Sequence, residues 1–268
     1  MDIFVDELVQ IWDDGGDGIL ALDGITHHFP SAKLTCLLGP SGCGKSTLAQ
    51  IVGGIERATR GTIRIIDPAD PSRPPAKPGE SSVMMWQNLN LFPWRNVIDN
   101  VAFGLEMAGV PRKVRYARAR ELISLVGLKG FEEKQCSQLS GGMRQRVALA
   151  RALIMDRPIL LMDEPFAALD AQTKIVMQEE LTRIFELTRK TILFVTHAID
   201  EAILLGDEVV VMTARPGRVK EVIKIDLPRP RTQELINSPE FGELYDRILH
   251  LIREEVLNAM RQQDEVTE

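Results

Sequence analysis

The stretch GPSGCGKST, residues Gly39–Thr47, decides the fold of this 268-residue chain. It follows an apolar run of strand length, Lys33–Leu38, and it opens a helical pattern. Glycines in such a turn let backbone N–H groups close around a phosphate chain, while Lys45 reaches the outer phosphates and the Ser46 hydroxyl can ligate Mg²⁺. The alternative is a plain glycine-rich turn, but the preceding strand favours a phosphate-binding loop.

Apolar runs of strand length recur along the chain and alternate with helical patterns. They are Lys33–Leu38, Ser82–Met85, Ile159–Met162, Thr191–Thr196 and Glu208–Thr213. This alternation predicts an α/β fold with a mostly parallel, layered sheet.

No strand pattern occurs between Leu89 and Met155, where three helical patterns follow one another. They cover Val97–Met107, Pro111–Val126 and the run after Gly142. We therefore expect a helical subdomain, about residues 89–155, inserted into the α/β core. The proline-rich segment Asp67–Pro78 is expected to be a surface loop.

The composition changes again at LPRPR, Leu227–Arg231, and a long helical pattern follows with Ser238 and Pro239 at its start. Its apolar face is formed by Phe241, Tyr245, Ile248, Ile252 and Val256. We interpret this helix as a packing appendage. The predicted organisation is one large domain over residues 1–231 and a C-terminal helical extension over residues 232–268.

The bulk properties exclude several classes of protein. The formal net charge of −6 and the pI near 5.4 argue against a protein that binds nucleic acid through its overall electrostatic field. Cys36, Cys43 and Cys136 are odd in number and lack paired spacing, so we expect neither disulfides nor zinc, and a reducing compartment. The acidic N-terminus does not resemble a secretory signal, and the longest apolar runs fall far short of the ~20 residues of a membrane span.

Four polar residues at predicted strand ends are candidates for catalysis. Asp163 and Glu164 close the run PILLMDEP, where Asp163 is placed to hold Mg²⁺ and Glu164 to orient or deprotonate water. Gln87 and His197 each follow another strand and are expected to reach towards metal or water and towards the terminal phosphate, respectively. Taken singly, each is more typical of a solvated turn or of an ordinary polar residue at a strand end, and their order along the chain is what favours a common site.

A second glycine-rich turn opens another helix. In SQLSGGMRQRVALARAL, Ser137–Leu153, the residues Ser140, Gly141 and Gly142 precede a run with one apolar helical face. A helix N-terminus with free N–H groups and no obstructing side chains is suited to a phosphate. The chain therefore has two predicted phosphate cradles about a hundred residues apart.

Together these motifs resemble those of the ATP-binding subunits of ABC transporters, over residues Val5–Arg231. LSGGMRQR, Leu139–Arg146, is the signature motif that separates this family from other phosphate-loop proteins. The resemblance implies a P-loop ABC ATPase core, with a mostly parallel sheet, a small antiparallel sheet and the inserted helical subdomain. It also implies a D-loop at Ala168–Asp170.

The resemblance assigns a role to each candidate residue. Catalysis is expected to involve Glu164, His197, Gln87 and Lys45, and Mg²⁺ to be held by Ser46, Gln87 and Asp163. ATP is expected to contact Gly39, Pro40, Ser41, Gly42, Cys43, Gly44, Lys45, Ser46, Thr47, Trp12, Ser140, Gly141 and Gly142. Trp12 takes the place of an aromatic that stacks on adenine, although it could instead pack into the small first sheet.

The resemblance also implies partners. In this family a second ATP-binding subunit, identical or related, supplies the signature motif to each site, and two chains sandwich two nucleotides. The expected function is an ATPase that drives uptake of a small solute at the cytoplasmic face of the cell membrane, with membrane permease subunits and, indirectly, a solute-binding protein. Phe92 and Trp94 are expected either to contact a membrane subunit or to be subdomain core.

Three stretches resemble importers of nitrate, sulfonate, taurine and related compounds: Leu91–Glu106, Ala214–Val219 and Asp226–Arg231. Trp86 and Ala167 depart from the usual Phe and Ser, and these departures concern the substrate branch. The alternative is a soluble ABC ATPase of a nucleic-acid or translation machine, which would predict a tandem cassette, a long coiled-coil insertion or zinc-type cysteine pairs. None of these is present in the sequence.

Overall fold

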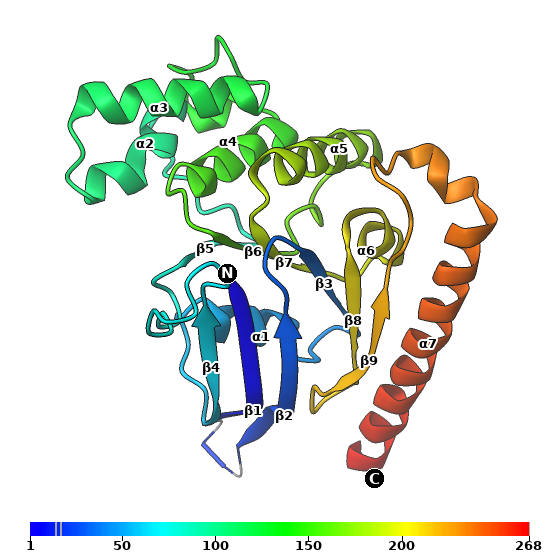
Figure 1. Cartoon of the computed structure of the whole chain (residues 1–268). Coiled ribbons are helices and arrows are strands. Elements are labelled where there is room, and N and C mark those ends of the chain that lie inside the picture. Colours follow the sequence, from blue (N-terminus) through cyan, green and yellow to red (C-terminus); the bar gives the residue numbers. More distant parts are fainter. Residues whose placement is uncertain (14, 17, 268) are drawn as a thin grey trace.

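The computed structural model describes residues 1–13, 15–16 and 18–267, with side chains described as far as residue 260. Two sheets form the centre of the molecule (Figure 1). The strands are β1 (Asp2–Trp12), β2 (Ile19–Phe29), β3 (Leu34–Leu38), β4 (Arg60–Ile66), β5 (Ser82–Met85), β6 (Ile159–Asp163), β7 (Thr191–Thr196), β8 (Glu208–Met212) and β9 (Val219–Lys224). The five predicted strands are confirmed, with ends that differ by at most one residue.

The larger sheet has the order β5-β6-β7-β3-β8-β9, and all its pairs are parallel except β8 with β9. The smaller sheet, β2-β1-β4, is antiparallel. The predicted combination of a mostly parallel sheet with a small antiparallel one is therefore confirmed. The parallel arrangement places the C-terminal ends of β3, β5, β6 and β7 along one edge of the sheet.

The helices are α1 (Lys45–Val52), α2 (Val97–Met107), α3 (Arg112–Leu125), α4 (Gly141–Leu153), α5 (Ala171–Thr188), α6 (Ile199–Leu205) and α7 (Pro239–Thr267). Two short 3-10 turns cover Cys136–Gln138 and Gln233–Asn237. The three helical patterns predicted between residues 89 and 155 correspond to α2, α3 and α4, which lie together above the sheets in Figure 1. The predicted loop 67–78 has no helix or strand.

Every residue of β3, β6 and β7 is buried, because both faces of these strands are covered. Since side chains alternate along a strand, Leu37, Leu161 and Leu193 pack on one face against α1 and the smaller sheet. Their neighbours Cys36, Leu160 and Phe194 pack on the other face among the helices. Helix α1, which follows the phosphate loop, is thus fixed between two sheets.

Helix α7 runs down one side of the molecule and packs on α6 and β8 (Figure 1). Phe241 and Ile248 are buried in the main core, whereas Tyr245, which the sequence pattern places on the same apolar face, is 36% exposed. The reason is geometric: the contact stripe passes through Leu244, and Tyr245 lies one helical step of about 100° further round. The predicted boundary at residue 231 stays a prediction.

The linker before α7 is held by a buried guanidinium. Arg231 donates hydrogen bonds to the carbonyl oxygens of Ile203, Gly206, Ile225 and Leu227. Burial lowers the pKa of Arg231 to about 10. Carbonyls at the end of α6 thus find donors, and the linker that leads to α7 is fastened to the core.

Candidate nucleotide site

The phosphate loop, residues Gly39–Thr47, connects β3 to α1. Gly42 and Gly44 have φ of 76° and 94°, in the left-handed region that favours glycine. A Cβ on Gly44 would also lie 2.5 Å from Leu22 Cδ2 and 2.9 Å from the Ala21 carbonyl oxygen. Both the backbone conformation and the lack of space therefore require glycine at residue 44, where α1 begins.

Lys45 is buried and folded back into this loop. Its Nζ donates to the carbonyl oxygens of Gly39 and Pro40, each over 2.9 Å. The Cys43 side chain is also buried, and burial raises the pKa of its thiol, so only the backbone of Cys43 can serve a ligand. The carbonyl groups of the loop thus hold the Lys45 ammonium group within the phosphate loop itself.

Ser46 and Asp163 come together at the ends of α1 and β6. The Ser46 hydroxyl donates to Asp163 Oδ1 over 2.8 Å. Burial raises the pKa of Asp163, against the effect of this hydrogen bond. A hydroxyl and a carboxylate oxygen at this separation are the kind of protein ligands Mg²⁺ uses when phosphates and water complete its shell, so these residues fit the expected metal.

Glu164 joins the remaining candidates. Its Oε2 accepts a hydrogen bond from Gln87 Nε2 over 3.3 Å and lies 3.4 Å from His197 Nδ1. Glu164 has a φ of 43°, which is uncommon for a residue other than glycine and is often found at functional sites. Polar residues beyond the ends of β5, β6 and β7 therefore meet at one carboxylate. Gln87 is bonded to Glu164 and not to the Ser46–Asp163 pair.

A cavity of about 450 Å³ lies over the phosphate loop. Its lining residues are Trp12, Ile19, Ala21, Ser41, Gly42, Gly44, Lys45, Ser46, Thr47, Gln87, Glu164 and Arg215. Trp12 ends β1 at this cavity, as the adenine assignment requires. His197 lies in a smaller neighbouring pocket of about 110 Å³ that it shares with Glu164.

Sequence reasoning missed Arg215 as a member of this cavity. We noted its segment, Ala214–Val219, only as a resemblance to one branch of importers. Its place in the cavity results from the β8–β9 hairpin, which a local pattern does not reveal.

The signature turn, Ser140–Gly142, is built as an N-terminal cap. Ser140 is the N-cap of α4, and its Oγ accepts from the Met143 N–H over 3.3 Å. A Cβ built on Gly141 would point into open space, whereas one on Gly142 would be 2.3 Å from Thr173 Cγ2. None of the three lines the cavity that contains Lys45. The two predicted phosphate cradles are therefore not parts of one cavity within a single chain.

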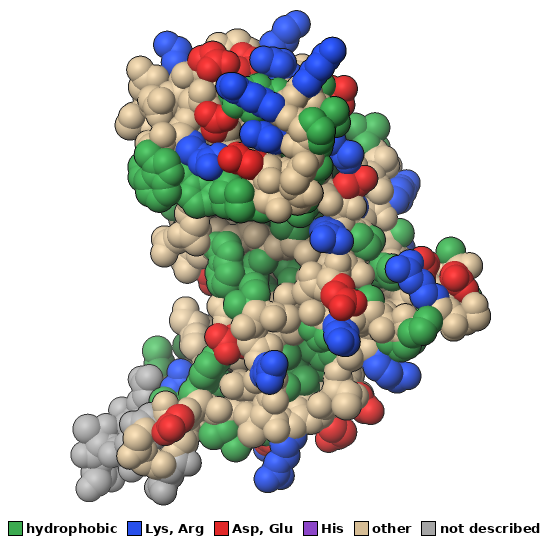
Figure 2. Space-filling view, turned by 90° about the vertical axis from the view of Figure 1, so that its left-hand side faces the viewer, with side chains coloured by type: hydrophobic (Ala, Val, Ile, Leu, Met, Phe, Trp, Pro, Cys, Tyr) green, Lys and Arg blue, Asp and Glu red, His purple; other side chains and the backbone are tan. Residues whose placement is uncertain are grey.

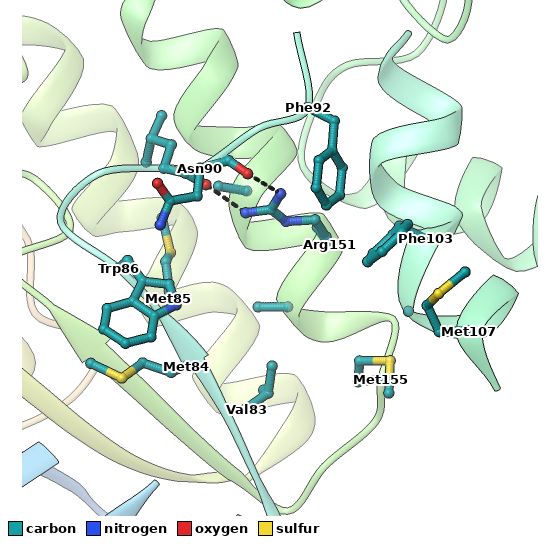
Figure 3. A pocket seen from close by; sticks show the side chains of 14 residues that line it. Val83, Met84, Met85, Trp86, Asn90, Phe92, Phe103, Met107, Arg151 and Met155 are labelled. Atoms are coloured by element: carbon teal, nitrogen blue, oxygen red, sulfur yellow. Dashed lines mark hydrogen bonds between the residues drawn. The ribbon is translucent and has the colours of Figure 1, made fainter. Parts of the chain in front are cut away.

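A second cavity, about 460 Å³, is apolar and lies between the larger sheet and the helical part formed by α2, α3 and α4 (Figures 2 and 3). Arg151 of α4 donates to the carbonyl oxygens of Leu89 and Asn90, which fixes the segment after Gln87 along its wall. Phe92 lies against Phe103, with ring centroids 4.5 Å apart, and is half-buried. Trp94 is 74% exposed and is therefore not subdomain core.

Comparison with curated proteins finds close relatives over nearly the whole chain. The chain is 46% identical to an uncharacterized ABC transporter ATP-binding protein of Methanocaldococcus jannaschii, over 96% of this chain and 93% of that protein. It is 44% identical to a taurine import ATP-binding protein of Rhizobium johnstonii, over 87% and 89% of the two chains. It is 38% identical to a nitrate import ATP-binding protein of Synechocystis, over 94% and 96%.

Among solved structures, a similar chain is that of an ATP-binding cassette described as a dimeric, post-hydrolysis state bound to ADP and Pi. It is 28% identical, the TM-score is 0.71, and the match covers 84% of this chain and 100% of that one. In the described residues no helix is both long and apolar enough to cross a membrane. The family model described as ABC transporter matches residues 22–167, more than half of the chain. The chain therefore belongs to the ABC transporter family, as an ATP-binding subunit of the ABC ATPase type.

Proposed function

We propose that this chain powers an importer. It hydrolyses ATP in a Mg²⁺-dependent reaction and pairs with a second ATP-binding subunit, and together they drive separate membrane subunits from the cytoplasmic face of the membrane. The observation that carries the proposal is the assembly at Glu164. Its carboxylate is shared by Gln87 and His197 and follows directly on Asp163, the acceptor of the Ser46 hydrogen bond. Such a set of groups is suited to placing water beside a bound phosphate chain.

Each side chain has a distinct task in this proposal. Lys45 exchanges its two loop carbonyls for phosphate oxygens when ATP enters. Ser46 and Asp163 hold Mg²⁺, which when bound neutralises charge on the phosphates. Glu164 orients the attacking water or takes its proton, and His197 and Gln87 keep that carboxylate in position. Trp12 stacks on the base at the other end of the cavity.

The second phosphate cradle acts in a partner chain. Charge on the γ-phosphate must be neutralised on all sides, and a phosphate loop covers only one. The signature turn supplies a helix N-terminus with free N–H groups, but it lies outside its own chain's cavity. Two chains arranged head to tail bring each signature turn to the other's phosphate loop. The dimeric description of the similar cassette supports this arrangement.

A mixed dimer tests the head-to-tail arrangement, if this chain pairs with itself. Lys45→Ala impairs the phosphate loop and Ser140→Arg blocks the signature turn, so neither homodimer is expected to occlude labelled ATP. In a mixed dimer of the two variants, sites built in trans leave one site with both motifs intact, and occlusion returns. Confirmed mixed dimers that occlude no more ATP than either homodimer would refute the arrangement.

The apolar cavity is the proposed seat of the membrane subunits. Figure 2 shows hydrophobic side chains gathered in the hollow between the helical part and the rest of the molecule. Met107 of α2 lines this cavity and is 64% exposed, so apolar surface there is open to a partner (Figure 3). A cytoplasmic helix of a permease would cover this apolar surface, and movements of the adjoining segment after Gln87 would be transmitted to it.

Introducing a charge into this apolar surface tests the contact. Met107→Asp is expected to release integral membrane proteins from the chain purified from its native membrane and to abolish uptake, while the isolated chain keeps its ATPase activity. Leu187→Asp, at a 65% exposed position on α5 outside this cavity, is the matched control. Loss in both variants, or in neither, would contradict the assignment.

The solute is proposed to be a small anion or zwitterion such as nitrate, taurine, a sulfonate or bicarbonate. The support is similarity to proteins named as taurine and nitrate import subunits. Uptake of each labelled compound, measured in cells with the native chain and with Glu164→Gln, tests it. Uptake that depends on the chain but excludes all four compounds would remove this solute class and leave the importer role.

A further inference from the structure

The β8–β9 hairpin loop, residues 213–218, lies directly against the phosphate loop. A Cβ on Gly217 would lie only 2.1 Å from the Cys43 carbonyl oxygen. The Gly217 N–H donates to the Ala21 carbonyl over 2.9 Å, and its carbonyl accepts from the Asp23 N–H over 3.0 Å. The hairpin loop therefore joins the phosphate loop to β2 without room for a side chain between them.

The backbone of the hairpin loop is fixed on both sides of Arg215. Thr213 Oγ1 donates to the Pro216 carbonyl and accepts from the Arg218 N–H, each over 2.9 Å. The Ala214 N–H donates over 2.8 Å to Oε2 of Glu255, a buried carboxylate of α7. Because its neighbours are held in this way, Arg215 is presented by a rigid support.

The Arg215 side chain is a cation without a partner at the nucleotide cavity. It lines that cavity with Trp12, Ser41 and Lys45, and its Nη2 would lie 3.3 Å from a Cβ on Gly42. In the part of the chain that the structure describes, its guanidinium makes no hydrogen bond or ion pair, whereas Arg218 nearby is paired with Asp23. A guanidinium left unpaired beside a phosphate loop is available to an anionic ligand.

We propose that Arg215 binds the phosphate chain of the nucleotide, as a second cationic contact beside Lys45. The inference rests on the nucleotide site proposed above. Arginine presents a planar fork of donors that matches phosphate oxygens, and it stays charged at any physiological pH. A cation at the mouth of the cavity attracts the charged phosphates and not the uncharged base and ribose. Arg215 therefore favours phosphorylated nucleotides over nucleosides.

Calorimetric titration of the purified chain with Mg-ADP and with adenosine separates these contributions. One charge-assisted contact predicts that Arg215→Ala weakens ADP binding about tenfold. Adenosine affinity is expected to stay the same, and Arg215→Lys to retain part of the ADP affinity. Arg253→Ala is the matched control, because it removes the same charge from an exposed position on α7.

Two outcomes overturn the inference: unchanged ADP affinity in Arg215→Ala, or equal losses for ADP and adenosine, which would place the contact on the base or ribose. Lys45→Ala distinguishes failure of the inference from failure of the proposed site. If Lys45→Ala loses ADP binding and Arg215→Ala does not, only the role of Arg215 is wrong. If Lys45→Ala binds ADP normally, the nucleotide site itself is misplaced.

Discussion

Replacing Gly142 by alanine tests how the signature turn is packed against α5. Its Cβ would lie 2.3 Å from Thr173 Cγ2, whereas the next nearest heavy atoms, Thr173 Cβ and Oγ1, are 3.7 and 3.8 Å away. The Thr173 methyl group cannot simply rotate away, because Oγ1 of the same side chain donates to Asp170 Oδ2 over 2.7 Å. Asp170 is also the N-cap of α5. Gly142→Ala must therefore displace α4 from α5 or break the bond to this cap.

The magnitude follows from two opposing effects. Overfilling a packed contact costs about 1–3 kcal/mol, whereas alanine in place of glycine inside a helix gains about 1 kcal/mol. We expect Gly142→Ala to lower the free energy of unfolding by about 1 kcal/mol. In Thr173→Ser the methyl group is gone and the hydroxyl remains, so in that background Gly142→Ala is expected to be neutral or stabilising.

The assay is a double-mutant cycle for Gly142→Ala and Thr173→Ser, measured by urea unfolding with two optical probes that must coincide. The expected coupling energy is about 1–3 kcal/mol in favour of the double variant, since the whole clash involves one methyl group. A coupling energy within about 0.5 kcal/mol of zero would show that the two helices are not in this contact, and the reasoning would fail.

Glu164→Gln should bind ATP normally but lose turnover by about 10²–10⁴-fold, as expected when a general base is removed; steady-state hydrolysis near the native rate would exclude this role. Trp12→Ala should weaken nucleotide binding about ten- to a hundredfold, from the roughly 1–3 kcal/mol of base stacking, and a collapse of the melting temperature with unchanged affinity would instead indicate packing. Because burial raises the pKa of Asp163, its ionised form costs stability above that pKa. Asp163→Asn should therefore raise the melting temperature of the nucleotide-free chain at pH 7, with a gain that disappears as the pH falls through the raised pKa, and should weaken Mg²⁺-dependent binding. A lower melting temperature at pH 7 would contradict the desolvation argument.

The central strands could be predicted because each is short, predominantly apolar and bounded by glycine, proline or polar residues. β3, β6 and β7 are buried on both faces, so the pattern directly reflects the packing. The strands of the small sheet were not located from the pattern. β1 contains irregularities in its pairing between Val5 and Leu8, and Glu7 has a φ of 46°, so regular alternation is interrupted.

The candidate site was predictable to the extent that its residues lie in local motifs. The phosphate loop and the Asp163–Glu164 pair each occupy one short segment at the end of a strand. Because these strands are parallel, their C-terminal ends bring such segments to the same edge of the sheet. Arg215 is different, because its place depends on the β8–β9 hairpin folding back over the phosphate loop. The exposure of Trp94 likewise depends on how three helices pack, and no periodicity in its own segment determines it.

The separation of the signature turn from its own chain's phosphate loop has a kinetic consequence. If each working site needs one motif from each of two chains, a dilute chain binds nucleotide but does not turn it over. Its specific activity should then rise with protein concentration, and the velocity should follow the square of that concentration until dimers saturate. Anything that raises the local concentration of chains, such as attachment in pairs beneath a membrane complex, would switch hydrolysis on without any change in the affinity of a single chain for ATP.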